Sequence, residues 1–154
     1  MVSLFGWILV LHILASIAVI GPALVVPVIR RSARTVGQLR FAFDVTNKLA
    51  ILPKIGGAVL IITGVWLMII TKMGLSQMWL SISILLSLLM VVTIEGMIGP
   101  RMKKIMEIVS ISQSKGDEVP SELDRLMKKI VPIETASQLL MIAITVLMIL
   151  KPFS

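Results

Sequence analysis

Long apolar stretches with little or no charge alternate along this chain with basic ones. From Leu4 to Ile29 there is no Asp, Glu, Lys or Arg. A helix that rises about 1.5 Å per residue makes this stretch longer than the roughly 30 Å hydrocarbon core of a bilayer. It is followed by arginines and lacks a basic n-region, so we interpret it as a retained helix and not as a cleaved signal peptide. The whole pattern predicts four transmembrane helices, at about residues 4–29, 48–71, 75–99 and 130–150.

The three connections between these helices differ in length and charge. Residues 72–77 leave room only for a tight turn, which predicts an antiparallel hairpin of the second and third helices. Residues 30–47 and 100–129 form longer, charged loops. The second of these loops contains apolar positions at helical spacing, so it either continues the third helix into solvent or docks on lipid or a partner; these positions are Met102, Ile105, Met106 and Val109. A helix start that leads into the fourth span is expected near Pro120-Ser121.

Composition agrees with a membrane protein. Hydrophobic residues make up 57% of the 154 residues and charged residues only 15%, against roughly 25% charged residues in soluble proteins. The mean hydropathy is +1.03. We therefore expect residues 1–154 to form one all-α domain, a bundle of four antiparallel transmembrane helices.

The positive charge predicts how the chain crosses the membrane. Of the 15 Lys and Arg residues, twelve lie in segments 30–48 and 101–129, whereas Lys72 and Lys151 lie on the opposite side. The positive-inside rule places both long loops in the cytoplasm and both termini outside the cell membrane. The net charge of +7 then indicates contact with anionic lipid headgroups and not with nucleic acid. The expected headgroup contacts are Arg30, Arg31, Arg34, Lys103, Lys104, Lys128 and Lys129.

Several kinds of chemistry lack the residues they need. There is no cysteine and only one histidine, so neither a cysteine nucleophile nor a multi-histidine metal site is predicted. The G-x-S-x-G and H-E-x-x-H motifs are also missing. The sequence leaves enzymatic activity open but favours a protein that is not an enzyme.

Ionisable residues within the predicted spans are the candidate functional residues. Such a side chain costs roughly 2.5–3.5 kcal/mol near the bilayer centre unless it has a partner or a water-filled cavity. Lys54, Glu95 and Glu134 lie at similar depth near the cytoplasmic side. Together with Gln138 they are expected to form a buried polar cluster. This cluster is either a clamp that fixes the order of the helices or a relay for protons or ions.

Helical spacing also predicts which faces of two spans point inward. On the second span, steps of three and four residues connect Lys54, Gly57, Ile61, Gly64 and Met68. On the fourth span, the shared face consists of Glu134, Ser137, Gln138, Met141, Thr145 and Met148. Small residues on such faces let helices approach closely.

His12 lies in the outer half of the first span. It is either a polar packing residue, a proton carrier or a haem ligand. If haem were bound, the second axial ligand would be Met68, Met148 or His12 of another copy. Methionine is also ordinary packing material in helical bundles.

Short motifs give the chain a family resemblance. Leu11-His12-Ile13-Leu14-Ala15, Pro53 with Gly64-Val65-Trp66-Leu67, and Trp79-Leu80 resemble a group of small bacterial inner-membrane proteins. The group comprises uncharacterised predicted integral membrane proteins, copper-resistance D-like domains and four-helix membrane protoporphyrinogen oxidases. In the oxidases, the histidine that matches His12 is linked to haem, together with a lysine that follows the Trp-Leu pair. Here Ser81-Ile82-Ser83 follows that pair, so the resemblance favours the uncharacterised branch.

Three functions remain as hypotheses. The first is an accessory or structural membrane component, which could form a homo-oligomer. The second is a haem- or quinone-linked redox protein that uses His12. The third is an oligomeric small transporter or channel in which Lys54, Glu95 and Glu134 line the path.

Overall fold

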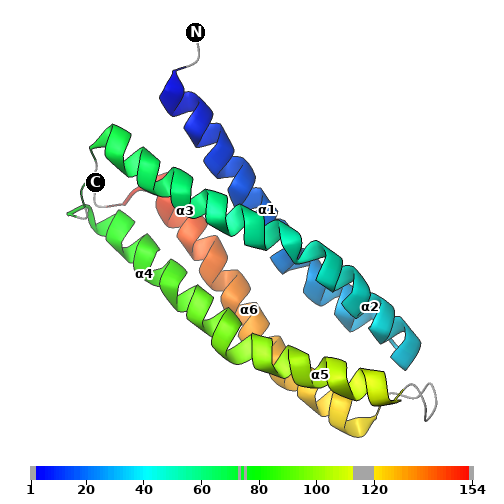
Figure 1. The fold of residues 1–154 in the computed structure, drawn as a ribbon. Helices are drawn as coiled ribbons and strands as arrows, with labels where there is room; N and C mark the ends of the chain where they lie inside the picture. Colours follow the sequence, from blue (N-terminus) through cyan, green and yellow to red (C-terminus); the bar gives the residue numbers. More distant parts are fainter. Residues whose placement is uncertain (1–2, 73, 75, 113–119, 153–154) are drawn as a thin grey trace.

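The computed structural model describes residues 3–72, 74, 76–112 and 120–152. All regular elements in this part are helices that run along one elongated bundle (Figure 1). They are α1 (Leu4–Ser32), α2 (Val36–Leu49), α3 (Ile51–Thr71), α4 (Met78–Thr93), a π-helix η1 (Ile94–Ile98), α5 (Gly99–Ser112) and α6 (Ser121–Leu150). We call the end with α2, α5 and the start of α6 the basic end, and the other end the terminal end.

Four continuous helical stretches are long and apolar enough to cross a membrane. They are Leu4–Ser32, Val36–Thr71, Met78–Ser112 and Ser121–Leu150. Many large apolar side chains on them are exposed, as lipid-facing positions require. This confirms the predicted all-α fold with four spans.

The segments expected as loops are largely helical. In place of a loop at 30–47, α1 continues to Ser32, and α2 begins after Thr35, whose hydroxyl accepts a hydrogen bond from the backbone N–H of Gln38. The junction of α2 and α3 lies at Ala50, because Pro53 has no N–H to bond the carbonyl of Leu49 four residues earlier. The expected continuation of the third helix is present as α5.

The helices pack as two pairs. α1 packs along α3, and α4 packs along α6, whereas α3, a fully described helix, packs against neither α4 nor α6. The short connection therefore reverses the chain direction but does not form the packed hairpin expected from the sequence. The close approach of the two backbones explains why α3 packs against α1. A Cβ atom on Gly56 would lie 3.0 Å from both the carbonyl oxygen of Ala15 and the Cβ of Ala18. Gly56 thus lets α1 lie directly against α3.

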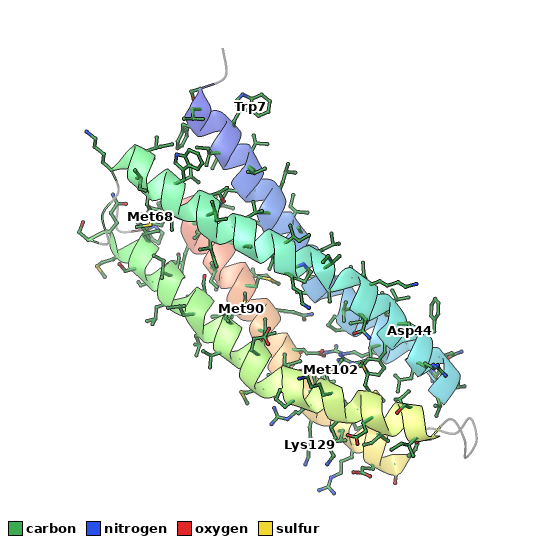
Figure 2. The ribbon with its side chains drawn as sticks, in the orientation of Figure 1. Trp7, Asp44, Met68, Met90, Met102 and Lys129 are labelled. Atoms are coloured by element: carbon green, nitrogen blue, oxygen red, sulfur yellow. The ribbon has the colours of Figure 1, made fainter. Side chains whose placement is uncertain are left out.

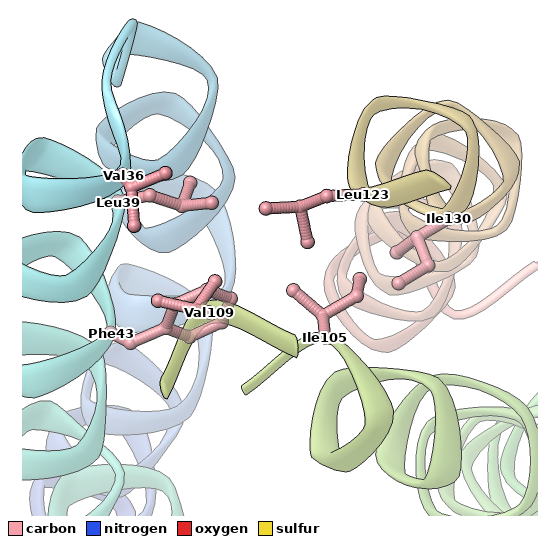
Figure 3. Close-up of a cluster of buried hydrophobic side chains, with 7 residues drawn as sticks. All are labelled: Val36, Leu39, Phe43, Ile105, Val109, Leu123 and Ile130. Carbon is pink, nitrogen blue, oxygen red and sulfur yellow. The ribbon is translucent and has the colours of Figure 1, made fainter. Parts of the chain in front are cut away.

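The most deeply buried apolar cluster lies at the basic end, where three helices meet (Figure 3). Helix α2 contributes Val36, Leu39 and Phe43, and its partners in the cluster are Ile105, Val109, Leu123 and Ile130 from α5 and α6. Ile105, Leu123 and Ile130 have no exposed area. The apolar face of α5, which the sequence left open to lipid, a partner or solvent, therefore packs largely against the chain itself. The two helix pairs are joined mainly through this cluster.

Candidate functional site

A buried ion pair connects the first and fourth spans. Nη2 of Arg30 lies 2.5 Å from Oε1 of Glu134, and the two side chains are only 3% and 7% exposed. Nη2 of Arg31 lies 3.4 Å from the second carboxylate oxygen. Nη1 of Arg30 donates to the sulfur of Met102, 3.5 Å away, so the pair also touches α5. One carboxylate thus holds together α1 and α6 at the point where the apolar stretch of α1 ends.

Arginine suits this position better than lysine would. Its planar guanidinium stays charged in a protein and presents several donors in a fixed fork, which matches a buried carboxylate. Two buried charges gain from each other only when the geometry is close, as it is here. The sequence pattern identified Glu134 as a candidate but assigned Arg30 only to topology and lipid contact.

The expected cluster of Lys54, Glu95 and Glu134 is not assembled. The side chains of Lys54 and Glu95 are exposed, and neither forms a salt bridge with another described residue. Glu134 pairs with arginines instead, because Arg30 and Arg31 at the end of α1 reach its carboxylate. Within one chain, these three residues do not line a common path.

Gln138 has a different partner. Its Nε2 donates a 3.1 Å hydrogen bond to the carbonyl oxygen of Ala23 in α1. Pro27 stands four residues after Ala23 inside the same helix and has no N–H to donate to that carbonyl. In lipid, a free carbonyl must find a donor within the protein. Gln138 supplies this donor and ties α6 to α1 a second time.

His12 contacts the neighbouring helix through a hydroxyl group. Its Nδ1 lies 2.8 Å from Oγ1 of Thr63, whose side chain is 3% exposed. The Thr63 hydroxyl donates to the backbone carbonyl of Val59, 2.7 Å away, so its proton is already in use. In the tautomer that satisfies both contacts, Nδ1 of His12 donates to Thr63 and Nε2 of the neutral ring carries the lone pair. Gly64 leaves room for the ring, since a Cβ there would lie 3.4 Å from Cε1 of His12.

The predicted inward face of the second span is correct only in part, at Gly64, which lies against His12 of α1. Gly56 and Thr63 are buried against α1, whereas Ile61 is 70% exposed and a Cβ on Gly57 would meet no atom within 4 Å. On the fourth span, Glu134 and Met141 are buried.

The two methionines considered as haem ligands lie on fully described helices that do not pack against each other. Met68 lies at the terminal end of α3 (Figure 2), five residues beyond Thr63. Met148 lies on α6, which does not pack on α3. Within the described ranges there is no group of three or more His, Cys, Asp or Glu residues that could hold a metal ion.

The basic end carries most of the residues expected to contact lipid headgroups. Figure 2 shows Met102 and Lys129 there. Arg31, Arg34 and Lys128 are exposed, and so are Lys103, Lys104 and Lys129. Arg30 differs, because it is buried and engaged with Glu134; its role inside the fold corrects the expectation of a free headgroup contact.

A family comparison identifies the class of protein. The sequence profile of the family described as "Predicted integral membrane protein (DUF2269)" matches residues 7–152. The chain belongs to this family. The match agrees with four spans in a lipid bilayer and with the resemblance to uncharacterised integral membrane proteins. Searches of curated proteins and of solved structures found no match for this DUF2269 protein.

Proposed function

We propose that this DUF2269 protein is a non-catalytic component of the bacterial cell membrane that works as an oligomer of its own chain. The observation that carries the proposal is a pair of opposite charges, Lys54 and Glu95, that are exposed on two of its membrane spans. The buried polar groups behave differently. Among the described residues, every buried side-chain nitrogen or oxygen atom has a hydrogen-bond partner. This supports a structural role for the buried polar groups. Lys54 and Glu95, which lack a salt-bridge partner among the described residues, lie on the surface.

The two exposed charges lie at matching depth. Lys54 lies 17 residues before Thr71, the last residue of α3, and Glu95 lies 17 residues after Met78, the first residue of α4. At about 1.5 Å per residue, both are about 25 Å from the terminal ends of their helices. Opposite charges at one depth attract each other strongly where water is scarce. Because α3 does not pack against α4 or η1, both fully described, each charge is free to meet its counterpart on a second copy.

A two-fold axis along the membrane normal fits these positions. In Figure 1, α3 and the α4–α5 helix lie in front of α1 and α6, so they form one face of the molecule. When two such faces meet across a two-fold axis, α3 of one copy lies beside α4 and η1 of the other. The contact between Lys54 and Glu95 then forms twice.

Charge also supports an orientation in the membrane. Twelve of the 15 basic residues belong to the basic end or its connections, which favours a cytoplasmic basic end and external termini. In this orientation, Arg31, Arg34, Lys103, Lys104, Lys128 and Lys129 face the anionic headgroups of the inner leaflet.

A charge swap tests the oligomer. The mass of the purified protein is measured in lipid nanodiscs or mild detergent by light scattering. Lys54→Glu alone, or Glu95→Lys alone, brings like charges together and should lower the oligomer fraction. The double variant Lys54→Glu/Glu95→Lys should restore it. Lys103→Glu on the exposed surface of α5 is the control and should leave the mass unchanged. A wild-type protein that stays monomeric at every concentration would refute the proposal.

A redox role for His12 is the second candidate function. The observation in its favour is the hydrogen bond between Nδ1 of His12 and the Thr63 hydroxyl, because metal-ligating histidines commonly donate their other ring N–H to a hydrogen-bond acceptor in the protein. Nε2 then carries the lone pair that a haem iron would take.

Absorption spectroscopy tests this candidate. The protein is expressed with ample haem and purified in detergent. A Soret band that disappears in His12→Ala and weakens in Thr63→Val would support the redox role. A colourless wild-type preparation would count against it and would leave the oligomer proposal untouched.

A further inference from the structure

A cavity of about 190 Å³ lies at the basic end between the end of α1 and the first three turns of α6. Four charged side chains line it: Arg30, Arg31, Asp124 and Lys128. Its remaining wall consists of Ala33, Met127 and Val131. The cavity is therefore a polar recess with apolar sides.

The charges around the cavity do not cancel. Glu134 neutralises one of the two arginines, and Asp124 lies 2.6 Å from the ammonium group of Lys128. The three cations and two carboxylates together have a net charge of one positive unit; they are Arg30, Arg31, Lys128, Asp124 and Glu134. A singly negative group in the recess would balance it.

Hydrogen-bond donors are also in excess. A guanidinium has five N–H donors and no acceptor. Arg30 is 3% exposed, and its partners are one carboxylate and the sulfur of Met102, a weak acceptor. Arg31 makes one contact with Glu134 at 3.4 Å and is 44% exposed. Several donors of a buried and a half-buried arginine thus border the recess, and phosphate oxygens are the acceptors that such forks match best.

The depth of the cavity matches the headgroup layer. Arg30 directly follows the uncharged stretch from Leu4 to Ile29, which is where a membrane's hydrocarbon gives way to phosphates. We propose that this cavity is a phosphate-binding site, with Arg31 and Lys128 as direct contacts and Arg30 as its floor. A phospholipid headgroup and inorganic phosphate from solution both carry this group. Only the lipid source rests on the proposed contact of the basic end with the inner leaflet.

Titration of the delipidated full-length protein tests the site. Native mass spectrometry counts bound dioctanoyl phosphatidylglycerol, and calorimetry gives its Kd. The double variant Arg31→Gln/Lys128→Gln should weaken binding at least about tenfold, as expected from the loss of two charge-assisted hydrogen bonds. Lys48→Gln/Arg125→Gln removes the same charge from exposed residues outside the cavity lining and should change the Kd by less than about twofold. Val131→Phe fills the recess without changing charge and should weaken binding as strongly as the first variant.

The outcomes separate the sources and the alternatives. Saturable binding of one lipid that inorganic phosphate does not displace identifies a headgroup site. Displacement by millimolar phosphate identifies a site for the free anion. Equal loss in the cavity variant and in the Lys48/Arg125 control would show diffuse surface charge and overturn the proposal, as would binding unaffected by Val131→Phe. Light scattering on the same samples reports oligomerisation separately, so failure of the site and failure of the proposed oligomer are distinguishable.

Discussion

The side-chain amide of Gln138 donates a 3.1 Å hydrogen bond to the backbone carbonyl of Ala23, the group that Pro27 leaves without its usual helical donor. A glutamine inside a membrane span is thereby explained by a proline on another helix. The arrangement has a measurable consequence, because the need for the amide exists only while Pro27 is present.

Gln138→Leu should lower the free energy of unfolding by about 1 kcal/mol, the usual size of an interhelical hydrogen bond in a membrane. In a Pro27→Ala background the loss should be much smaller, since the N–H of residue 27 then bonds the carbonyl of Ala23. The double-mutant cycle is measured by titrating the protein from mild detergent into SDS. Equal losses in the two backgrounds would contradict the assigned role of Gln138.

Breaking the ion pair of Arg30 and Glu134 on one side should cost far more stability than removing an exposed charge. Glu134→Gln leaves a buried guanidinium without its counter-charge, which typically costs 3–5 kcal/mol. Glu107→Gln on the exposed surface of α5 is the matched control, and its effect should be small. The double variant Arg30→Met/Glu134→Leu should recover most of the loss, because it removes both charges together. If Glu134→Gln behaved like the control, the buried pair would not be a structural connection between α1 and α6.

The sequence predicts some levels of this fold better than others. Long apolar stretches such as residues 4–29 are sufficient to predict the four spans, because about 20 mainly apolar helical residues cover the hydrocarbon core of a bilayer. Which helices pack against each other, in contrast, depends on close contacts between individual residues. Gly56 and Gly57 look equivalent in the sequence, yet only Gly56 faces Ala15. A shift of one residue on a helix turns a side chain by about 100°. The predicted inward face of the second span was therefore right only in part: it included Gly64, which lies against His12, but also the exposed Ile61 in place of the buried Thr63.

The buried charges show the same limit. Depth along the chain identified Glu134, but it indicated Lys54 and not Arg30 as the partner. Lysine near the end of a span can extend its ammonium group toward water, and Lys54 is exposed. Arg30 stands at the first position after the apolar stretch and looks like an ordinary topology signal. Its preference for planar carboxylate contacts is the one feature of the residue itself that could have indicated its burial.

Neighbouring glycines in α3 should respond oppositely to the same substitution. Gly56→Ala places a Cβ 3.0 Å from the carbonyl oxygen of Ala15 and from the Cβ of Ala18, so α1 and α3 must separate. We expect a loss of about 1–3 kcal/mol, as in other overpacked contacts. Gly57→Ala meets no atom within 4 Å and should be neutral or stabilising by up to about 1 kcal/mol through helix propensity. SDS titration of both variants compares them directly, and a larger loss for Gly57→Ala would argue against the observed α1–α3 contact.

The cluster at the basic end should behave like the core of a water-soluble domain. Leu123 has no exposed area and packs within the cluster formed by α2, α5 and α6, so Leu123→Ala removes buried methyl groups and leaves a cavity. Such substitutions cost about 2–5 kcal/mol. Leu139 lies on the same helix but is 63% exposed within the span, and Leu139→Ala should cost less than about 1 kcal/mol. Hydrogen exchange adds a regional readout, because Leu123→Ala should speed amide exchange in α2 and α5 while the middle of α3 and α4 stays protected by lipid. If exchange rose evenly over all helices, the basic end would not be a separate packing unit, and the two helix pairs would have to be joined within the membrane.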